Sequence, residues 1–119
     1  MSHTKKIEYL RDFAALRDWD QFHTPKNLAA ALSVEASELL EIFQWLTTEE
    51  SFLKSDTINR SRAKEELADV YIYLLRISDR LDIDLEDAFW SKVEKNAEKY
   101  PVELSKSNAT KYNQRTKDN

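Results

Sequence analysis

The sequence of 119 residues contains no cysteine and no glycine, and only two prolines. Without cysteine, the chain has no means of forming disulfides, thiolate metal sites or a cysteine nucleophile. Without glycine, it lacks the residue that tight β-hairpins and glycine-rich phosphate-binding loops require. These absences exclude several common kinds of site and favour a helical fold over a β-rich one.

The chain also lacks long apolar runs and an excess of basic charge. No apolar stretch approaches the roughly 20 residues that span a membrane, and residues 1–6 lack the apolar core of a signal peptide. The formal net charge is −4, with no basic stripe of the kind that binds a nucleic-acid backbone. We therefore predict a cytoplasmic protein that binds neither membranes nor nucleic acids.

Four amphipathic segments with helical spacing follow one another along the chain. We expect helices at residues 5–18, 25–46, 60–81 and 85–100. Thr24 and Asp84 suit the N-cap position and Pro25 the first helical position, whereas the polar residues 47–59 predict a loop. Four such helices with short links predict an all-α four-helix bundle.

The length allows one small domain, which we place at residues 1–101. Pro101 ends the last helix, and residues 102–119 contain few large apolar side chains, so we expect a polar, flexible C-terminal tail. A core of this size is marginal by itself, which makes self-association expected.

Carboxylates interrupt the apolar stripe of the second predicted helix. The stripe consists of Leu28, Ala31, Leu32, Leu39, Ile42 and Leu46. At about 100° per residue, Glu35 falls near its middle and Glu38 at its edge. A charged side chain facing a core is costly unless it is paired or bound to metal.

The third predicted helix repeats this arrangement. We expect its core stripe to consist of Ala63, Leu67, Val70, Leu74, Ile77 and Leu81. Glu66, Asp69 and Tyr73 form a row along one flank of this stripe. A further apolar side, with Tyr71, Ile72 and Leu75, offers a surface for a neighbouring subunit.

Packed together, the two helices would bring four carboxylates into one place. Hard oxygen ligands suit Mg²⁺ or Mn²⁺, and these ions suit phosphate substrates. The alternative is that the carboxylates are surface groups paired with basic neighbours such as Arg60, Arg62 or Lys64. A di-iron bundle would add Glu-x-x-His pairs, whereas His3 and His23 lie outside the acidic pairs.

Aromatic and basic residues flank the acidic pairs. Trp19, Phe22 and Trp45 lie near the ends of the predicted helices, where they offer stacking platforms for a nucleobase or, alternatively, ordinary packing. Lys92, Asn96 and Lys99 share one face of the fourth helix and suit phosphate oxygens. The alternative for these three is a solvated helix face.

Together these residues resemble the all-α NTP pyrophosphatase superfamily, the MazG-like group, and within it the dCTP pyrophosphatase branch. The resemblance covers about residues 7–101. It is carried by Arg-Asp-Trp-Asp-Gln-Phe-His at 17–23, by Glu-Ala-Ser-Glu-Leu-Leu-Glu-Ile-Phe-Gln-Trp at 35–45, by Glu-Leu-Ala-Asp-Val-Tyr-Ile-Tyr at 66–73, and by residues 92–101.

The resemblance implies an Mg²⁺-dependent hydrolysis of a nucleoside triphosphate between the α- and β-phosphates, and a homo-oligomer, dimer or tetramer. The metal ligands it implies are Glu35, Glu38, Glu66 and Asp69, with Glu38 our choice as general base. Around the base and sugar it implies Trp19, His23, Trp45 and Tyr73. At the phosphates it implies Lys92, Asn96 and Lys99, although relatives often carry arginine at the last position.

Three interpretations remain open at this level. The first is an enzyme acting on dCTP or a modified dCTP. The second keeps the fold but prefers another substrate, such as dUTP or a damaged purine triphosphate. The third is a non-enzymatic helical interaction module, in which the carboxylates have no function.

Overall fold

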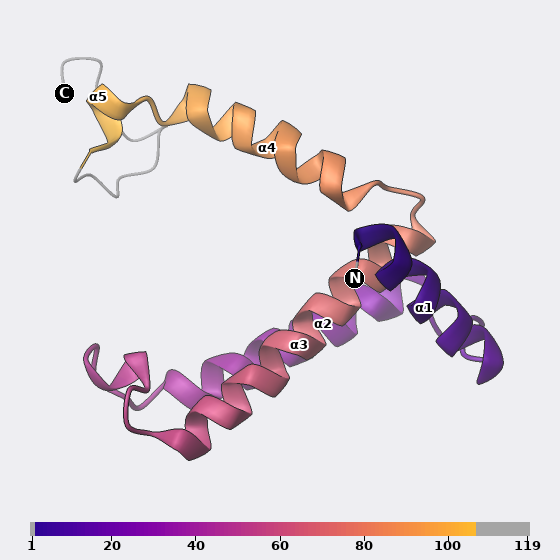
Figure 1. The fold of residues 1–119 in the computed structure, drawn as a ribbon, viewed down its shortest axis with the longest axis horizontal. Helices are drawn as coiled ribbons and strands as arrows, with labels where there is room; N and C mark the ends of the chain where they lie inside the picture. Colours follow the sequence, from indigo (N-terminus) through magenta and orange to yellow (C-terminus); the bar gives the residue numbers. More distant parts are fainter. Residues whose placement is uncertain (1, 107–119) are drawn as a thin grey trace. The chain divides into compact units, whose positions relative to one another are not determined.

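The chain forms two helical units in a computed structural model that describes residues 2–106 (Figure 1). The first unit covers residues 1–83 and the second begins at residue 84. Their positions relative to each other are not determined. All regular elements between residues 2 and 106 are helical, which confirms the all-α prediction.

The four long helices begin and end within three residues of their predicted bounds. The first unit contains α1 (His3–Leu16), α2 (Pro25–Phe43), the short 3-10 helix η1 (Glu50–Phe52) and α3 (Thr57–Arg80), and the second contains α4 (Leu85–Lys99) and α5 (Val102–Ser105). The α3 helix starts three residues earlier than expected. Because α2 also ends three residues early, the predicted loop at 47–59 moves to residues 44–56, keeps its length and includes η1.

Side-chain caps explain where the long helices begin. The Thr24 hydroxyl accepts a hydrogen bond from the Asn27 N–H at 3.2 Å, and the Asp84 carboxylate accepts one from the Asp87 N–H at 3.1 Å. Both caps were predicted. The earlier start of α3 comes from Asp56, whose carboxylate accepts the Asn59 N–H at 3.0 Å and binds the Asn59 amide at 2.7 Å.

Removing the Asp56 cap is expected to destabilise the first unit. An N-cap aspartate satisfies a backbone N–H that is otherwise left without a partner, so Asp56→Ala should lower the free energy of unfolding by about 1 kcal/mol. Urea denaturation monitored by circular dichroism measures this change. Ser55→Ala, one residue earlier and making no cap, is the control and should change stability by less than half as much.

Two helices end in left-handed turns that glycine usually occupies. Asp18 (φ 55°) follows α1 and Asp82 (φ 55°) follows α3. In each case the next N–H reaches back into the helix, from Trp19 to the Ala14 carbonyl and from Ile83 to the Ser78 carbonyl, both at 2.9 Å. Aspartate tolerates this conformation better than most residues, so the chain makes Schellman-type helix ends without glycine.

The α2 and α3 helices pack along their length, and α1 packs against α3 (Figure 1). Few side chains become buried as a result. In the described part of the chain the buried apolar residues are Ala14, Leu28, Ile42, Leu53, Ala63 and Leu75. Such a small core leaves much apolar surface exposed on the helical hairpin that α2 and α3 form.

The predicted core face of α3 is only partly right: Ala63 is buried and Val70 and Ile77 are half-buried, as expected. Leu67, Leu74 and Leu81 are exposed, whereas Leu75, expected on the outer side, is only 2 % exposed. The α2 stripe is as predicted, with Leu28 and Ile42 buried. A packing seam, the line of inward-facing residues that recurs every 3.5 residues, passes through Ala63, Glu66 and Tyr73. Glu66 therefore belongs to this seam and not to its flank.

The segment directly after Pro101 forms one turn of helix. The α5 helix covers the first residues of the predicted tail, and residues 107–119, which carry the rest of that prediction, lie outside the described residues. The division of the chain into a domain at 1–101 and a tail at 102–119 stays a prediction. None of the helices within 2–106 is both long enough and apolar enough to pass through a membrane.

Candidate metal centre and aromatic pocket

Three carboxylates converge where α2 and α3 face each other. One oxygen each of Glu35, Glu38 and Glu66 lies within 4.8 Å of the other two. Two oxygens on opposite sides of one Mg²⁺ lie about 4.2 Å apart, since each bond is about 2.1 Å long. The spacing of the three side chains therefore suits a small divalent cation after only a slight contraction.

The proximity of these groups disfavours their ionised forms. Burial, followed by the neighbouring carboxyls of Glu66 and Glu38 and the charges of Glu38 and Asp69, raises the pKa of Glu35 to about 7. Burial and the charges of Glu38 and Asp69 also raise the pKa of Glu66. The protein thus assembles negative charge that it does not itself neutralise.

Two carboxylate oxygens in this cluster are buried without a hydrogen-bond partner. They are the Oε2 atoms of Glu35 and Glu66. An acceptor without a partner is unfavourable, and a bound cation would supply the missing partner. Orphaned oxygens on two facing helices are the observation that fits the residues to a divalent metal ion.

The alternative of surface salt bridges is not what the structure contains. Within residues 2–83 the ion pairs join Arg11, Arg76, Asp20 and Asp79, and none of them includes Glu35, Glu38 or Glu66. The fourth predicted ligand, Asp69, lies outside the group of three. Its charge still acts on the pKa values of Glu35 and Glu66.

An aromatic pocket of about 250 Å³ lies between α1, α3 and the turn that precedes α2. It is lined by Tyr9, Leu10, Phe13, Ala14, Trp19, His23, Ile72, Tyr73 and Arg76. Three of the residues expected around a base and sugar, Trp19, His23 and Tyr73, thus share one cavity. Tyr73 follows Glu66 by seven residues, so the pocket lies two helical turns, or about 10 Å, from the carboxylates along α3.

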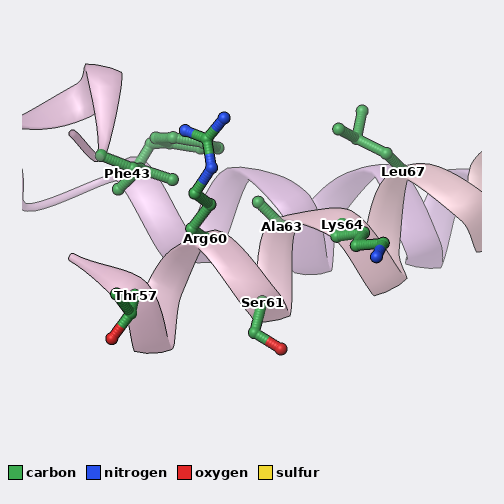
Figure 2. Close-up of a pocket in the computed structure, with 8 residues that line it drawn as sticks. Phe43, Thr57, Arg60, Ser61, Ala63, Lys64 and Leu67 are labelled. Atoms are coloured by element: carbon green, nitrogen blue, oxygen red, sulfur yellow. The ribbon is translucent and has the colours of Figure 1, made fainter. Parts of the chain in front are cut away.

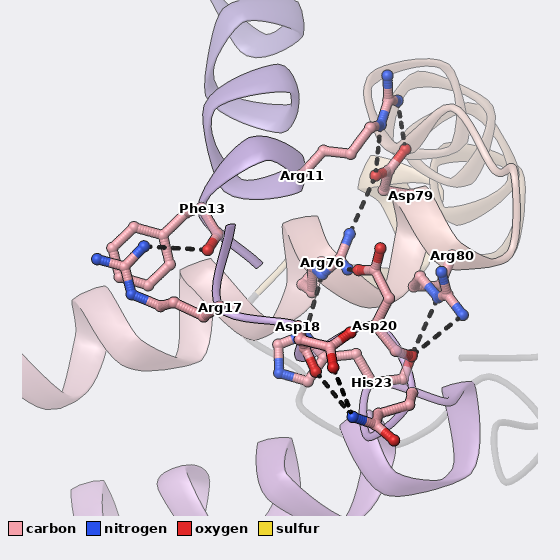
Figure 3. Close-up of polar contacts among 10 residues, drawn as sticks. Arg11, Phe13, Arg17, Asp18, Asp20, His23, Arg76, Asp79 and Arg80 are labelled. Atoms are coloured by element: carbon pink, nitrogen blue, oxygen red, sulfur yellow. Dashed lines mark hydrogen bonds and ion pairs between the residues drawn. The ribbon is translucent and has the colours of Figure 1, made fainter. Parts of the chain in front are cut away.

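A network of ionic hydrogen bonds supports one side of this pocket (Figure 3). Arg11 binds Asp79 with two hydrogen bonds, at 2.7 and 3.1 Å. Arg76 donates to His23, Asp20 and Asp79, and its side chain is 4 % exposed. The network connects α1 and α3 to the turn that carries His23.

The surroundings of His23 disfavour the protonated form of its imidazole. Burial is the largest cause that lowers its pKa, the positive charges of Arg76 and Arg80 add to it, and Asp20 opposes them. A ring with a lowered pKa accepts a proton less readily in the folded state than in the unfolded state. Acid should therefore destabilise the fold through this residue.

We expect His23→Gln to reduce the loss of stability in acid. Below a pH of about 6.5 the unfolded chain binds a proton at His23 that the folded chain does not, so wild-type stability falls as the pH falls. Glutamine cannot titrate, and its carbonyl oxygen can still accept from Arg76. Urea midpoints at pH 7.5 and 5.5 measure the effect, with His3→Gln as the control; equal acid losses in wild type and His23→Gln would contradict it.

The remaining predicted substrate residues are not brought to the pocket within the described units. Trp45 follows the C-terminus of α2, a helix of 19 residues that is about 28 Å long, whereas Trp19 and His23 precede its N-terminus. The Trp45 side chain is 87 % exposed. Lys92, Asn96 and Lys99 lie on α4 in the second unit, so their placement at the site stays a prediction.

A second, more open groove lies at the other end of the helical hairpin (Figure 2). Its volume is about 700 Å³, and its lining residues are Phe43, Leu53, Thr57, Arg60, Ser61, Ala63, Lys64 and Leu67. Figure 2 shows Arg60 rising from α3 beside Phe43. The groove thus combines an apolar floor with two cationic side chains.

Several residues around the pocket were missed by the sequence reasoning. Tyr9 and Phe13 on α1 and Asp20 in the following turn were not among the predicted site residues. Arg76 gave a detectable signal, because a charge between Leu75 and Ile77 interrupts an apolar run in the same way as Glu35 does. Applied to cations as well as to carboxylates, that criterion would have found it.

Comparison with known proteins relates the sequence and fold of this chain to one family. Residues 30–114 match the sequence model of the MazG-like family. A crystal structure of a pyrophosphatase from Archaeoglobus fulgidus is similar to this chain with a TM-score of 0.77 and 43 % identity, covering 85 % of this chain and 94 % of that one. The helical fold and the sequence therefore agree on the relationship.

Curated relatives come from mammals. The chain is 46 % identical over 102 residues to dCTP pyrophosphatase 1 of Mus musculus and 44 % identical to that of Homo sapiens. The matched region is 85 % of this chain and 60 % of each relative. The chain thus spans less than two thirds of the length of these relatives.

Proposed function

Since this chain belongs to the MazG-like family, we propose that it is an Mg²⁺-dependent nucleoside triphosphate pyrophosphohydrolase. The proposed substrate is dCTP or a modified dCTP, and the products are the monophosphate and pyrophosphate. The observation that carries this proposal is the pair of orphaned buried oxygens in a three-carboxylate cluster. The kinship to proteins named dCTP pyrophosphatase supports the choice of substrate.

The two parts of the site would divide the substrate between them. The aromatic pocket would hold the base and sugar, with Trp19 offering a stacking surface and His23 a polar contact. The triphosphate would extend along α3 toward the carboxylates, about two turns away. Lys92, Asn96 and Lys99 would contact phosphate oxygens from α4, supplying positive charge and amide hydrogen bonds.

The carboxylates would hold the metal and manage the proton of the attacking water. Glu35, Glu38 and Glu66 would be direct ligands, and Asp69 would be the fourth. Bound Mg²⁺, or Mn²⁺ in its place, would neutralise the triphosphate and lower the pKa of a bound water. Glu38, one turn after Glu35, is the proposed acceptor of the water's proton.

We further propose that a second copy of this chain completes the site. Trp45 is almost fully exposed and about 28 Å from the pocket of its own chain, so a role at the base requires another subunit. The apolar floor of the open groove and the exposed Leu67 are surfaces that such a contact would cover. The proposed assembly is a dimer or tetramer.

A product-resolved assay tests the proposed function. Canonical and modified NTPs and dNTPs are incubated with the protein and Mg²⁺, and the monophosphate plus pyrophosphate is separated from the diphosphate plus phosphate. We expect pyrophosphate release that is fastest with dCTP or a modified dCTP, and lost in Glu38→Ala. A preference for dUTP or a damaged purine would redirect the substrate. No turnover by folded protein would favour the interaction module.

A further inference from the structure

Arg76 is a buried cation whose contacts converge on one imidazole. It lies on α3, three residues after Tyr73, and lines the aromatic pocket. Its Nε atom donates to Nδ1 of His23 at 3.1 Å, and its terminal nitrogens bind Asp20 and, at 3.4 Å, Asp79 (Figure 3). All three contacts use N–H groups of the guanidinium as donors.

The direction of the bond to His23 determines where the ring carries its proton. A guanidinium has five N–H donors and no acceptor, so Nδ1 must contribute a lone pair and carries no hydrogen. A neutral imidazole has one N–H, and the bond made by one nitrogen fixes the state of the other. The proton of His23 is therefore on Nε2.

The Nε2–H group is available to a ligand. Across residues 2–106 no side chain or carbonyl accepts a hydrogen bond from it, while His23 lines the pocket beside Trp19, with ring centroids 5.8 Å apart. The imidazole ring thus lies beside the ring of Trp19 and offers the pocket one N–H donor that the described residues do not use.

We propose that Arg76 is a positioning residue that fixes His23 as an Nε2–H donor to an acceptor atom of the bound pyrimidine. This inference rests on the proposed function for the identity of the ligand. The acceptor would be a carbonyl oxygen or an unprotonated ring nitrogen. A base presenting an amino group at the same point would bring two donors together and would be rejected.

The rest of the network explains how this arrangement is kept rigid. Arg80 Nε donates to the backbone carbonyl of His23 at 3.0 Å, so α3 holds both the ring and the backbone of this residue. Arg11 binds Asp79 at 2.7 Å and thereby helps to orient Arg76 from the other side. Each group is oriented by a neighbour that is itself bound.

Nitrogen NMR of the histidine side chains tests the proposal without reference to activity. The chain has two histidines, and the spectrum of His3→Gln assigns the signal of His23. We expect wild-type His23 to show a protonated Nε2 and an unprotonated Nδ1 at pH 7.5. A protonated Nδ1, or a mixture of the two tautomers, would overturn the proposal.

Arg76→Met separates positioning from simple tethering. Asp79 keeps its bonds to Arg11 in this variant, and Asp20 is half exposed, so we expect it to fold. His23 should then populate both tautomers. Arg80→Gln, which loses a bond to the His23 backbone but not to its ring, is the matched control and should keep the wild-type tautomer. An unchanged tautomer in Arg76→Met would mean that Arg76 only holds His23 in place and does not select its tautomer.

Ligand binding and kinetics test the contact to the base. Adding dCMP, the proposed product, should shift the Nε2 signal of wild-type His23, and no shift at saturation would exclude the contact. Loss of one oriented hydrogen bond corresponds to about a ten-fold rise in KM for dCTP in Arg76→Met, with kcat changed less than about two-fold. An unchanged KM would also count against it. Absence of turnover in the wild type would contradict only the proposed function, because the tautomer and dCMP measurements do not depend on turnover.

Discussion

Replacing Glu35 by glutamine is expected to make the metal-free protein more stable and to abolish its activity. Glu35 lies near the middle of the α2 stripe, and one of its oxygens is buried without a partner. Glutamine keeps the shape of the side chain, removes the charge and adds an N–H donor that a neighbouring carboxylate can accept. We expect a gain of about 1–2 kcal/mol in the free energy of unfolding and a loss of activity of about 10²–10³-fold.

The same substitution should remove a pH dependence of stability. The pKa of Glu35 is raised from 4.5 to about 7 in the folded protein, so between these pH values the folded chain holds a proton that the unfolded chain has released. The stability of the metal-free wild type should therefore fall as the pH rises from about 4.5 to about 7. In Glu35→Gln this contribution disappears.

Chemical denaturation in the presence of a chelator measures both effects, and pyrophosphate release with Mg²⁺ measures the activity. Glu41→Gln, on the exposed side of the same helix, is the matched control because it removes one carboxylate without touching the cluster. We expect it to retain activity and to change stability by less than about 0.5 kcal/mol. Should Glu35→Gln destabilise the metal-free protein, the carboxylates would not be repelling one another as described.

Much of the fold follows from patterns among residues that lie close together in the sequence. The four long helices were predicted because caps such as Thr24 and Asp84 and the stop at Pro101 act on residues close to them in sequence. The start of α3 was placed too late because Asp56 lies in a polar stretch without apolar periodicity. Its capping bond to Asn59 is local, however, and an Asp-x-x-Asn search would have found it.

The face of α3 required information that periodicity does not carry. Leu67, Leu74 and Leu81 recur every seven residues, and so do the seam residues Glu66 and Tyr73, so both sets fit a helical stripe. Which set turns inward depends on the partner helix, and α2 presents its own carboxylates at the seam. An apolar set on the outside of a small hairpin is what a further subunit would cover, so apolar periodicity alone does not identify the buried face.

The candidate site divides in the same way. The convergence of Glu35, Glu38 and Glu66 followed from two i, i+3 pairs on adjacent helices, a short-range pattern. The pocket around His23 depends on contacts across more than 50 residues, such as those of Arg76 with His23 and Asp20. Such pairings depend on how α3 packs against the turn before α2, which single-sequence spacing does not define.

Magnesium is expected to raise the thermal midpoint of the wild-type protein substantially. An ion that binds the folded state and not the unfolded state stabilises it by about 2.7 kcal/mol at one hundred times its Kd. For a domain of this size that corresponds to roughly 10 °C or more. The cluster is the physical source, because a cation satisfies the orphaned oxygens of Glu35 and Glu66 and relieves the repulsion among the three carboxylates.

The magnitude of this shift should depend on pH in a defined direction. Because the pKa of Glu35 is about 7 without metal, a proton competes with the ion at pH 6 and hardly at all at pH 8. We therefore expect a larger magnesium-induced shift at pH 8. Differential scanning calorimetry at the two pH values measures it, with sodium chloride at matched ionic strength to account for screening.

Glu66→Gln and Glu65→Gln form the decisive pair of variants for the magnesium response. They are adjacent on α3 and differ in charge by the same amount from wild type, but only Glu66 belongs to the cluster. We expect Glu65→Gln to keep the wild-type shift and Glu66→Gln to lose most of it. An equal response in both variants would mean that magnesium acts through general charge screening, and the carboxylate cluster would then not be a metal site.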